Sequence, residues 1–344
     1  MAAYISFQPS DFFNTLLYTG NGGTNSVTGV GFQPDFTWIK NRLEGDNHYQ
    51  CDAVRGAGKY IESSTNIAEV TNANGLSAFG SDGFTVGTQG SQVNDNTDSY
   101  VSWNWKAGTT SGLSGGTITP SAYSINTTSG FGIYKYTGGS STDTIAHGLG
   151  VAPKMIIIKS LTTTNDWTVY HAALGNDKLL VFNGTGTQVS DGTTWNSTSP
   201  TSTVWSMGNS GDVNNSARDY IAYVFAPKRG FSKFGSYVAN NNANGPFVYT
   251  GFRPSMVFMK NYVNGAWSWQ LLDCRREGYN SSNDQVYPNT ASAEGSDGYG
   301  DLMANGFKIT AANSGINDSG ATFIYAAFAE FPLVSSNSKA GVAR

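Results

Sequence analysis

Three similar stretches recur along the chain and decide its fold: GVGFQPDFTWIKN at 29–41, GLGVAPKMIIIKS at 148–160 and TGFRPSMVFMKN at 250–261. In each stretch a proline precedes a lysine by six residues, with a short, mainly apolar run between them. These pairs are Pro34 and Lys40, Pro153 and Lys159, and Pro254 and Lys260. Proline is tolerated at the first residue of a strand, and a short apolar run behind it is typical of a strand buried between two sheets.

The flanking sequence keeps the same register around all three stretches. Each is preceded by a phenylalanine and a tyrosine: Phe13 with Tyr18, Phe131 with Tyr136, and Phe231 with Tyr237. Each is followed by an aromatic strand pattern: YVSWNW at 100–105, YIAYVF at 220–225 and FIYAAF at 323–328. The lysine and the last aromatic residue of that pattern are separated by 65, 66 and 68 residues. We interpret this register as three diverged copies of one module.

Composition indicates the fold class of these modules. The chain has 42 glycines, 18 Tyr, 19 Phe and 8 Trp, and only 13% charged residues. Such a composition, with frequent Asn-Gly and Asp-Gly turns, favours short strands over helices. We therefore predict an all-β chain of three tandem β-sandwich (jelly-roll or lectin-like) repeats. The expected boundaries are 1–110, 120–229 and 230–334, followed by a C-terminal tail at 335–344. The Gly/Ser/Thr-rich stretch 106–121 is predicted to be a linker between the first two modules.

The bulk charge narrows the classes of partner. The chain has a net charge of −4 and no cluster of basic residues, so it lacks the positively charged surface that nucleic-acid binding needs. The longest apolar run is far too short to span a membrane, and the N-terminal MAAYISFQPSDFF lacks the pattern of a secretion signal. Two cysteines, Cys51 and Cys274, cannot form a disulfide framework or a zinc site by themselves. We expect both to be buried free thiols, and the protein to be made in a reducing cytoplasm.

The first and third copies share a set of charged residues. The segments CDAVRG and STNIAE carry Asp52, Arg55 and Glu69. The segments LDCRREG and NTASAE carry Asp273, Arg276 and Glu294. A glycosidase needs two carboxylates facing one cleft, but an arginine beside each aspartate keeps it ionised rather than acidic. We interpret both sets as structural ion pairs. In the middle copy His171 falls near the aspartate position.

No other group of residues indicates catalysis or metal binding. The three histidines, His48, His147 and His171, match no metal-binding or hydrolase motif, and we expect structural roles for His147 and His171. The acidic segments EGDN at 44–47 and NDNTD at 94–98 lack the spacing of a calcium loop. We predict no catalytic residues, no metal and no cofactor.

The middle copy also has a segment of its own, 183–213, rich in Gly, Ser, Thr and Asn. It contains two isolated tryptophans, Trp195 and Trp205. Loops on rigid sandwiches are where binding concentrates, and a tryptophan face can stack on a sugar ring. These two residues are therefore the predicted ligand-binding pair. The alternative is that both are buried beneath the loop.

The motifs quoted above, together with SDGFTVG, YVSWNWKAG and the ending FIYAAFAEFP, resemble a family of proteins frequent in marine tailed bacteriophages. The opening MAAYISFQPSDFFNTLLYTGNG is similar to the start of complete members. The resemblance implies a virion structural protein, a tail fibre or tail-associated protein with lectin-like sandwich modules, made in the host cytoplasm. It supplies no catalytic residues.

Three functions follow as hypotheses of different classes. The first is a non-enzymatic host-recognition protein whose partners are other virion proteins and a host surface glycan, without nucleic acid or membrane insertion. The second is a capsid decoration or cementing protein, and the third is a polysaccharide depolymerase. A symmetric homo-oligomer, most simply a trimer, suits fibre and spike proteins. Sequence leaves open the position on the virion, the host receptor, the oligomeric state and whether a glycan or calcium is bound.

Overall fold

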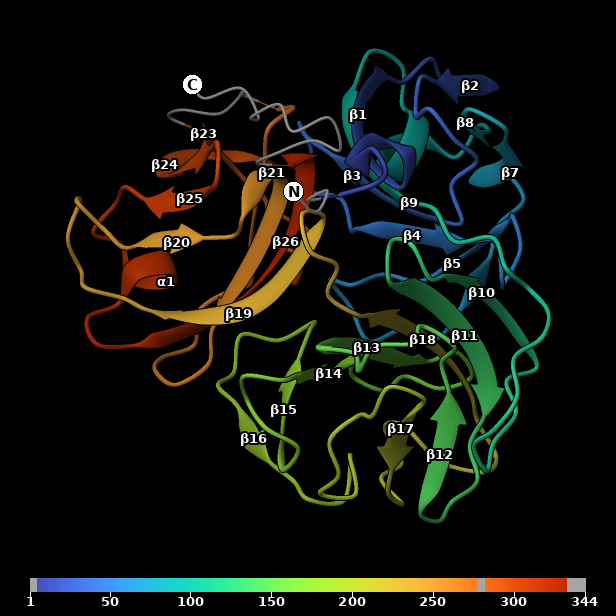
Figure 1. The fold of residues 1–344 in the computed structure, drawn as a ribbon. Helices are drawn as coiled ribbons and strands as arrows, with labels where there is room; N and C mark the ends of the chain where they lie inside the picture. Colours follow the sequence, from blue (N-terminus) through green and yellow to red (C-terminus); the bar gives the residue numbers. More distant parts are fainter. Residues whose placement is uncertain (1–4, 277–281, 333–344) are drawn as a thin grey trace.

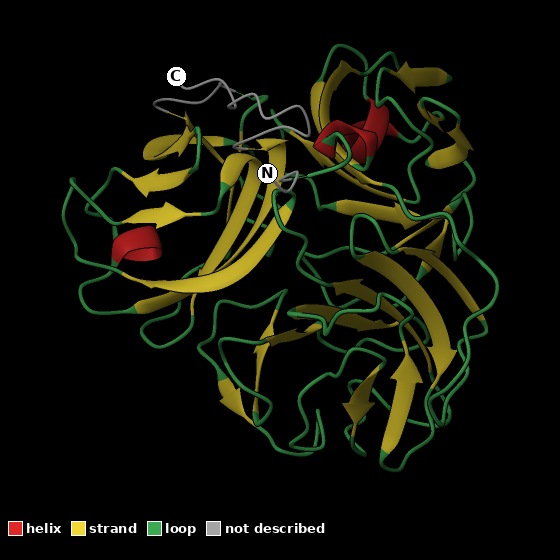
Figure 2. Ribbon diagram, in the orientation of Figure 1, coloured by secondary structure: helices red, strands yellow, loops and turns green. Residues whose placement is uncertain are grey.

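The computed structural model describes residues 5–276 and 282–332 and contains several antiparallel sheets and very little helix (Figure 2). Its helical pieces in that part of the chain are η1 (Pro9–Asp11), η2 (Gly90–Asn94) and α1 (Ser314–Asn317). The predicted all-β fold is therefore confirmed. The predicted tail 335–344 lies outside the described residues.

The strands form three groups arranged around a common centre (Figure 1). Each group has an inner four-stranded set with the same order, in which the last strand pairs with the first and with the Pro–Lys strand. The first inner set is β1 (Phe13–Thr19), β9 (Ser99–Trp105), β3 (Phe36–Asn41) and β4 (Tyr49–Asp52). The second is β11 (Phe131–Thr137), β18 (Asp219–Phe225), β13 (Met155–Ser160) and β14 (Thr168–His171). The third is β19 (Ser232–Val238), β26 (Thr322–Pro332), β21 (Phe252–Asn261) and β22 (Gln270–Asp273).

An outer sheet accompanies each inner set. The first comprises β2 (Asn25–Thr28), β8 (Gly83–Val86) and β7 (Leu76–Gly80), with a separate pair β5 (Lys59–Tyr60) and β6 (Val70–Thr71). The second comprises β12 (Asp143–Ala146) and β17 (Val204–Met207). The third comprises β20 (Phe247–Tyr249), β25 (Gly306–Ile309), β24 (Gly295–Met303) and β23 (Ser282–Gln285). The second inner sheet is widened by β10 (Ala122–Asn126), β15 (Lys178–Val181) and β16 (Val189–Ser190).

Strand register matches the sequence pattern closely. Phe36, Met155 and Met256 pair with Trp105, Phe225 and Phe328 respectively, so the three Pro–Lys strands meet the three aromatic strands at equivalent residues. We call the three groups modules and interpret them as diverged copies; their exact boundaries stay predictions. One residue of the sequence pattern is out of register. In the first module Phe13 pairs with Trp105, but the residue that pairs with Phe328 in the third module is Ser232 and not Phe231.

The modules are not independent sandwiches on a linker. Each has its own core between its two sheets, and a fourth cluster joins the inner sheets of all three. Strand alternation explains this arrangement, because one face of β9 carries Val101, Trp103 and Trp105 toward the shared cluster. The stretch 106–121 is no free spacer, since it runs along the second module and pairs at Thr109 with Ile125.

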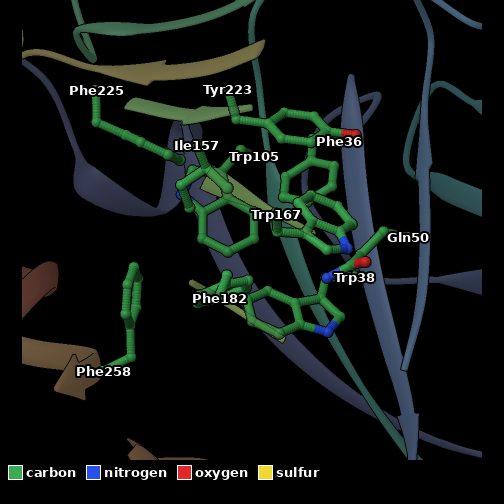
Figure 3. Close-up of a pocket in the computed structure, with 10 residues that line it drawn as sticks. All are labelled: Phe36, Trp38, Gln50, Trp105, Ile157, Trp167, Phe182, Tyr223, Phe225 and Phe258. Atoms are coloured by element: carbon green, nitrogen blue, oxygen red, sulfur yellow. The ribbon is translucent and has the colours of Figure 1, made fainter. Parts of the chain in front are cut away.

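Phe328, like Trp105 and Phe225, contacts aromatic rings of all three modules in this shared core. Its ring centroid lies 5.3 Å from that of Phe13, 5.5 Å from Trp105 and 5.6 Å from Phe225. The cluster is almost completely filled: a cavity of only about 20 Å³ remains, lined by side chains such as Trp38 and others drawn in Figure 3. Such a volume is enough for about one water molecule.

The three anchor lysines are buried, and their ammonium groups bond to main-chain carbonyls. Lys40 Nζ donates to Glu44 and Ala291, and Lys260 Nζ donates to Thr185 at 3.1 Å. The acceptors Ala291 and Thr185 belong to the neighbouring module in each case. Burial lowers the pKa of Lys40, Lys159 and Lys260 to about 8. The recurring spacing from proline to lysine thus buries a cation in each module. Lys40 and Lys260 reach a neighbouring module, whereas Lys159 Nζ donates to Ser160 and Thr163 of its own module.

Because one core spans the three modules, we expect the chain to unfold in one cooperative transition. Scanning calorimetry should give equal calorimetric and van't Hoff enthalpies. Phe328→Ala should lower the unfolding free energy by about 3–5 kcal/mol and shift the whole transition. Phe247→Ala, at a side chain that is 46% exposed, is the matched control and should change stability far less. Separate transitions for the modules would contradict this expectation.

Candidate functional site

The predicted ligand-binding pair is buried. Trp195 is 1% exposed and Trp205 is 0% exposed, and both lie in the core between the sheets of the second module. The prediction that their faces stack on a ligand is therefore wrong. The polar sequence around them suggested exposure, but both rings enter the module core, Trp205 from strand β17 itself and Trp195 from the loop that precedes it.

Both tryptophans anchor the segment 183–213 to the module. Trp195 packs edge-on against Tyr170 at 5.5 Å between centroids, and its indole N–H donates to the carbonyl of Lys178 at 3.1 Å. Trp205 packs edge-on against Tyr134 at 5.2 Å. The segment is therefore held from below by two large buried rings, and its polar residues form the surface above them.

That surface contains a groove of about 380 Å³ at one end of the β12–β17 sheet. Its lining is almost entirely hydroxyl, amide and glycine: Ser140, Ser141, Thr142, Gly192, Thr193, Asn196, Gly208 and Asn209. Five of the polar members are exposed, the exception being the half-buried Asn196. Such groups donate and accept hydrogen bonds without carrying charge. We take this groove as the candidate binding site.

The groove has an unusual backbone. Asn196 and Ser197 are consecutive non-glycine residues with φ of 52° and 44°, a left-handed conformation that costs roughly 1–2 kcal/mol per residue. Opposite them, a Cβ on Gly208 would overlap the carbonyl oxygen of Thr193. Strain of this kind persists only where the surroundings impose it, and it concentrates at functional sites. Trp195, the residue before this pair, is buried in the core of the second module.

One wall of the groove is fixed by Asp191. Its carboxylate accepts hydrogen bonds from the Thr193 hydroxyl and the Thr194 hydroxyl at 2.5 and 2.6 Å. Partial burial would raise the pKa of Asp191, but the hydrogen bonds from Thr193 and Thr194 outweigh it, so the pKa is lowered. The carboxylate therefore stays ionised and holds the wall in place.

The structure brings together the predicted charged residues of the first copy. Arg55 Nε lies 2.5 Å from Asp52 Oδ2, and Arg55 Nη1 lies 3.4 Å from Glu69. The side chains of Arg55 and Asp52 are fully buried. Asp52 also accepts a hydrogen bond at 2.7 Å from the hydroxyl of Tyr223, which belongs to the second module. The set joins two modules and faces no cleft.

The third copy repeats this arrangement with one addition. Arg276 Nε lies 2.7 Å from Asp273 Oδ2, and Arg276 Nη1 lies 3.0 Å from Glu294. Arg42 of the first module also binds Glu294, at 2.6 Å. Burial alone would raise the pKa of Glu294, but the hydrogen bonds from Arg42 outweigh it and the pKa falls to about 2. Sequence analysis missed Arg42, because its partner lies 252 residues away.

The middle copy replaces this ion pair by neutral residues. His171 pairs with Met155 as Asp52 pairs with Phe36 and Asp273 with Met256, so the position expected from sequence is the same in register. The arginine position is occupied by the buried Leu174. His171 Nε2 lies 3.2 Å from the carbonyl oxygen of Tyr325 in the third module.

All three histidines have the same hydrogen-bond pattern. In each ring Nδ1 accepts a hydrogen bond from an N–H group, and Nε2 lies within hydrogen-bond distance of a main-chain carbonyl. The donors are Trp38 for His48, Leu149 for His147 and Ala173 for His171. This pattern fixes the neutral tautomer with the proton on Nε2. Burial lowers the pKa of His48, His147 and His171, and that of His171 falls to about 4.

Three equivalent buried asparagines were also missed from sequence. Asn94, Asn214 and Asn317 are fully buried, and each side-chain amide donates to two loop carbonyls at 2.5 to 2.9 Å. Each closes the end of its module. A lone asparagine in a polar segment carries no sequence signal that separates this role from an exposed turn.

The remaining candidates have structural surroundings. Cys51 and Cys274 are buried free thiols, as expected. The two acidic segments come together at Asn41, whose amide donates to Asp46 and Asp98. Within residues 5–276 and 282–332, no group of three or more His, Cys, Asp or Glu side chains has a metal-binding arrangement.

Comparison with known proteins identifies the family. The model of a domain of unknown function (DUF7483) matches residues 8–332, so the chain belongs to that family. No curated protein and no solved structure matches the chain. Among the helices of the described ranges, none has the length and apolar character needed to cross a membrane.

Because Trp195 and Trp205 are anchors, Trp195→Ala and Trp205→Ala should each lower the unfolding free energy by about 3–5 kcal/mol. Denaturant unfolding of the purified variants measures this directly. Trp267→Ala is the matched control, since Trp267 is 38% exposed, and it should cost much less. A wild-type midpoint for the Trp195 variant would show that its ring does not anchor the segment.

The histidines should make the fold sensitive to mild acid. Their folded pKa values lie below 6.5, so between pH 6.5 and about 4 the unfolded chain binds more protons than the folded one. Stability should therefore fall as the pH drops below 6.5. For His171 the loss is about 3 kcal/mol on completion, at 1.36 kcal/mol per pKa unit.

His171→Gln tests this assignment, because the glutamine amide can still donate to the Tyr325 carbonyl but does not titrate. Unfolding free energies measured from pH 7 to 4.5 should show a shallower slope for this variant than for wild type. Equal slopes would mean that His171 does not titrate in this range on unfolding.

Proposed function

We propose that this chain is a structural protein of a tailed-phage virion that acts in host recognition, as a tail fibre or tail-associated protein. The observation that carries the proposal is the polar groove above Trp195. It combines a rigid, strained backbone with a lining of uncharged donors and acceptors. A sandwich that presents such a groove on anchored loops is suited to binding a neutral, hydroxyl-rich ligand.

The ligand class that fits this lining is a host surface glycan. Sugar hydroxyls both donate and accept hydrogen bonds, as do the side chains of Thr142, Asn196 and Asn209. The side-chain oxygen of Asn196 accepts a weak hydrogen bond from Thr142 at 3.5 Å. The N–H₂ group of Asn196 donates to no described residue, so it is available to a ligand. Recognition by hydrogen bonds replaces the stacking on tryptophan that the sequence suggested.

The proposed setting is the virion, with other virion proteins as partners and a homotrimer as the assembly. The shared core already closes three modules within one chain, so such a trimer would present several copies of the groove from one rigid body. Multiple weak glycan contacts then add through avidity. Analytical ultracentrifugation of the full chain tests the oligomeric state.

Two alternatives remain in competition. A cementing protein would bind the major capsid protein and no glycan; the interlocked interior of this fold suits that role equally well. A depolymerase would need two accessible carboxylates, whereas Asp52 and Asp273 are 0% and 1% exposed and paired with arginines. The groove therefore favours binding over hydrolysis as the proposed activity.

The double variant Thr142→Ala, Asn209→Ala tests the glycan proposal. It removes polar groups that make at most one weak internal hydrogen bond, so stability should change by less than about 1 kcal/mol. Affinity for host-surface polysaccharide, measured by glycan array and calorimetry, should fall roughly tenfold or more.

The matched control is Ser26→Ala, Thr28→Ala, at the equivalent outer strand of the first module. It should bind glycan like wild type. If wild type and the Ser26/Thr28 control variant bind no glycan, and antibody labelling places the chain on the capsid, the cementing alternative replaces this proposal.

A further inference from the structure

The third module has an open sheet edge. β19 ends the inner sheet and β20 ends the outer one, and each pairs on one side only within the described residues. We propose that this edge binds an extended acidic strand of a partner polypeptide, which adds to the inner sheet antiparallel to β19. Glycan binding at the second module plays no part in this argument.

The unpaired backbone groups can be assigned. Ala239 N–H donates to the carbonyl of Ala321, so Ala239 faces β26. Direction alternates along an antiparallel strand, so the N–H and C=O groups of Val238 and Ser236 point away from β26. Neither residue has another backbone partner in the described part of the chain. They form a free ladder of donors and acceptors, as an edge strand does when it accepts a further strand.

Both edge strands carry exposed apolar side chains. Val238 on β19 is 63% exposed, and Phe247 and Tyr249 on β20 are 46% and 49% exposed. They are three of the nine large hydrophobic side chains found exposed in the described structure. The side chains of Tyr237 and Ala239 on β19 and of Val248 on β20 enter the core between the sheets. Val238 therefore faces outward from the inner sheet, and Phe247 and Tyr249 face outward from the outer sheet. A strand added to β19 gains hydrogen bonds along the ladder and burial against Val238.

The second module shows how such an edge is covered. There β10 pairs with β11 along residues 122–126, and the preceding segment reaches the outer sheet through Gly116 and Ile118, both bridged to Ile145. In the third module the connection from β18 to β19 is only residues 226–231. Six residues span at most about 20 Å, so this connection cannot also supply a covering strand. Since no described segment pairs with the outer side of β19, we assign this position to a strand of another polypeptide.

Charge specifies the partner. Residues 226–252, which include β19 and β20, contain Lys228, Arg229 and Lys233 and no Asp or Glu, although the whole chain has a net charge of −4. An acidic segment is therefore attracted to this edge and deterred from the rest of the surface. By register, Ile125 of β10 lies opposite Gly132, and Lys233 occupies the position equivalent to Gly132. An acidic residue of the partner strand belongs opposite Lys233.

The chain itself supplies the probe. A fluorescent synthetic peptide of residues 117–127, which carries the covering strand of the second module, is titrated into the full-length protein alongside the same peptide with Ile125→Glu. Both peptides should bind the protein, which is seen as an increase in their fluorescence anisotropy. The Ile125→Glu peptide should bind roughly twofold to fivefold more tightly through Lys233, and Lys233→Ala in the protein should remove that difference.

Ser236→Pro tests the edge itself. It deletes an outward N–H without breaking a bond to β26, so the protein should fold normally and bind either peptide at least tenfold more weakly. Ser236→Val, the matched control, keeps the N–H and should bind like wild type. Hydrogen exchange should show new protection of the Ser236 and Val238 amides when the peptide is bound.

Three results would overturn the proposal. One is that neither peptide binds. Another is that peptide binding is unchanged by Ser236→Pro. The third is self-association of the protein through this edge, seen as a dimer in ultracentrifugation that Ser236→Pro dissociates, which would make a second copy the occupant. None of these outcomes bears on glycan binding, so the two proposals fail separately.

Discussion

The fold depends on one constraint: each inner sheet is apolar on both faces and must be covered twice. Its own outer sheet covers one face, and the inner sheets of the other two modules cover the other. Phe328, in contact with rings from all three modules, shows how complete this coverage is. A module taken alone would expose its second face to water, so the three modules stabilise one another as the subunits of a compact trimer do.

Polar contacts then fix the order of the modules around the shared core. The residue before the fourth strand of each inner set bonds through a ring nitrogen to a main-chain carbonyl of a neighbouring module. The pairs are His48 with Tyr287, Trp167 with Glu62, and Trp269 with Val181. These contacts run from first to third, second to first and third to second module, and so they close a cycle. Because buried donors without partners are costly, the cycle disfavours any other arrangement of the modules. His48 takes the place of an indole in this cycle, and it has to stay neutral because its Nδ1 accepts a hydrogen bond from the indole N–H of Trp38.

Such an interior constrains where function can reside. The buried arginines Arg55 and Arg276 are committed to ion pairs within the first and third modules, and Arg42 pairs with Glu294 across them. This leaves the outer loops and edges as the places where binding can reside. The second module has used this freedom to build a groove on segment 183–213, with Trp195 as its anchor. In the third module, as in the first, no described strand pairs with the outer side of the edge strand of the inner sheet. The two binding surfaces that we propose therefore lie on different modules and differ in chemistry.

Sequence by itself determined the all-β class, the register of the Pro–Lys and aromatic strands, and the pairing of Asp52 with Arg55 and Asp273 with Arg276. These are local properties, because strand alternation and a spacing of three residues act within one module. Tertiary structure alone decided that Trp195 and Trp205 are buried, that Arg42 reaches Glu294 and that Lys40 binds a carbonyl 251 residues away. Burial and long-range contact depend on how the modules close on one another, and no pattern within a single module encodes that.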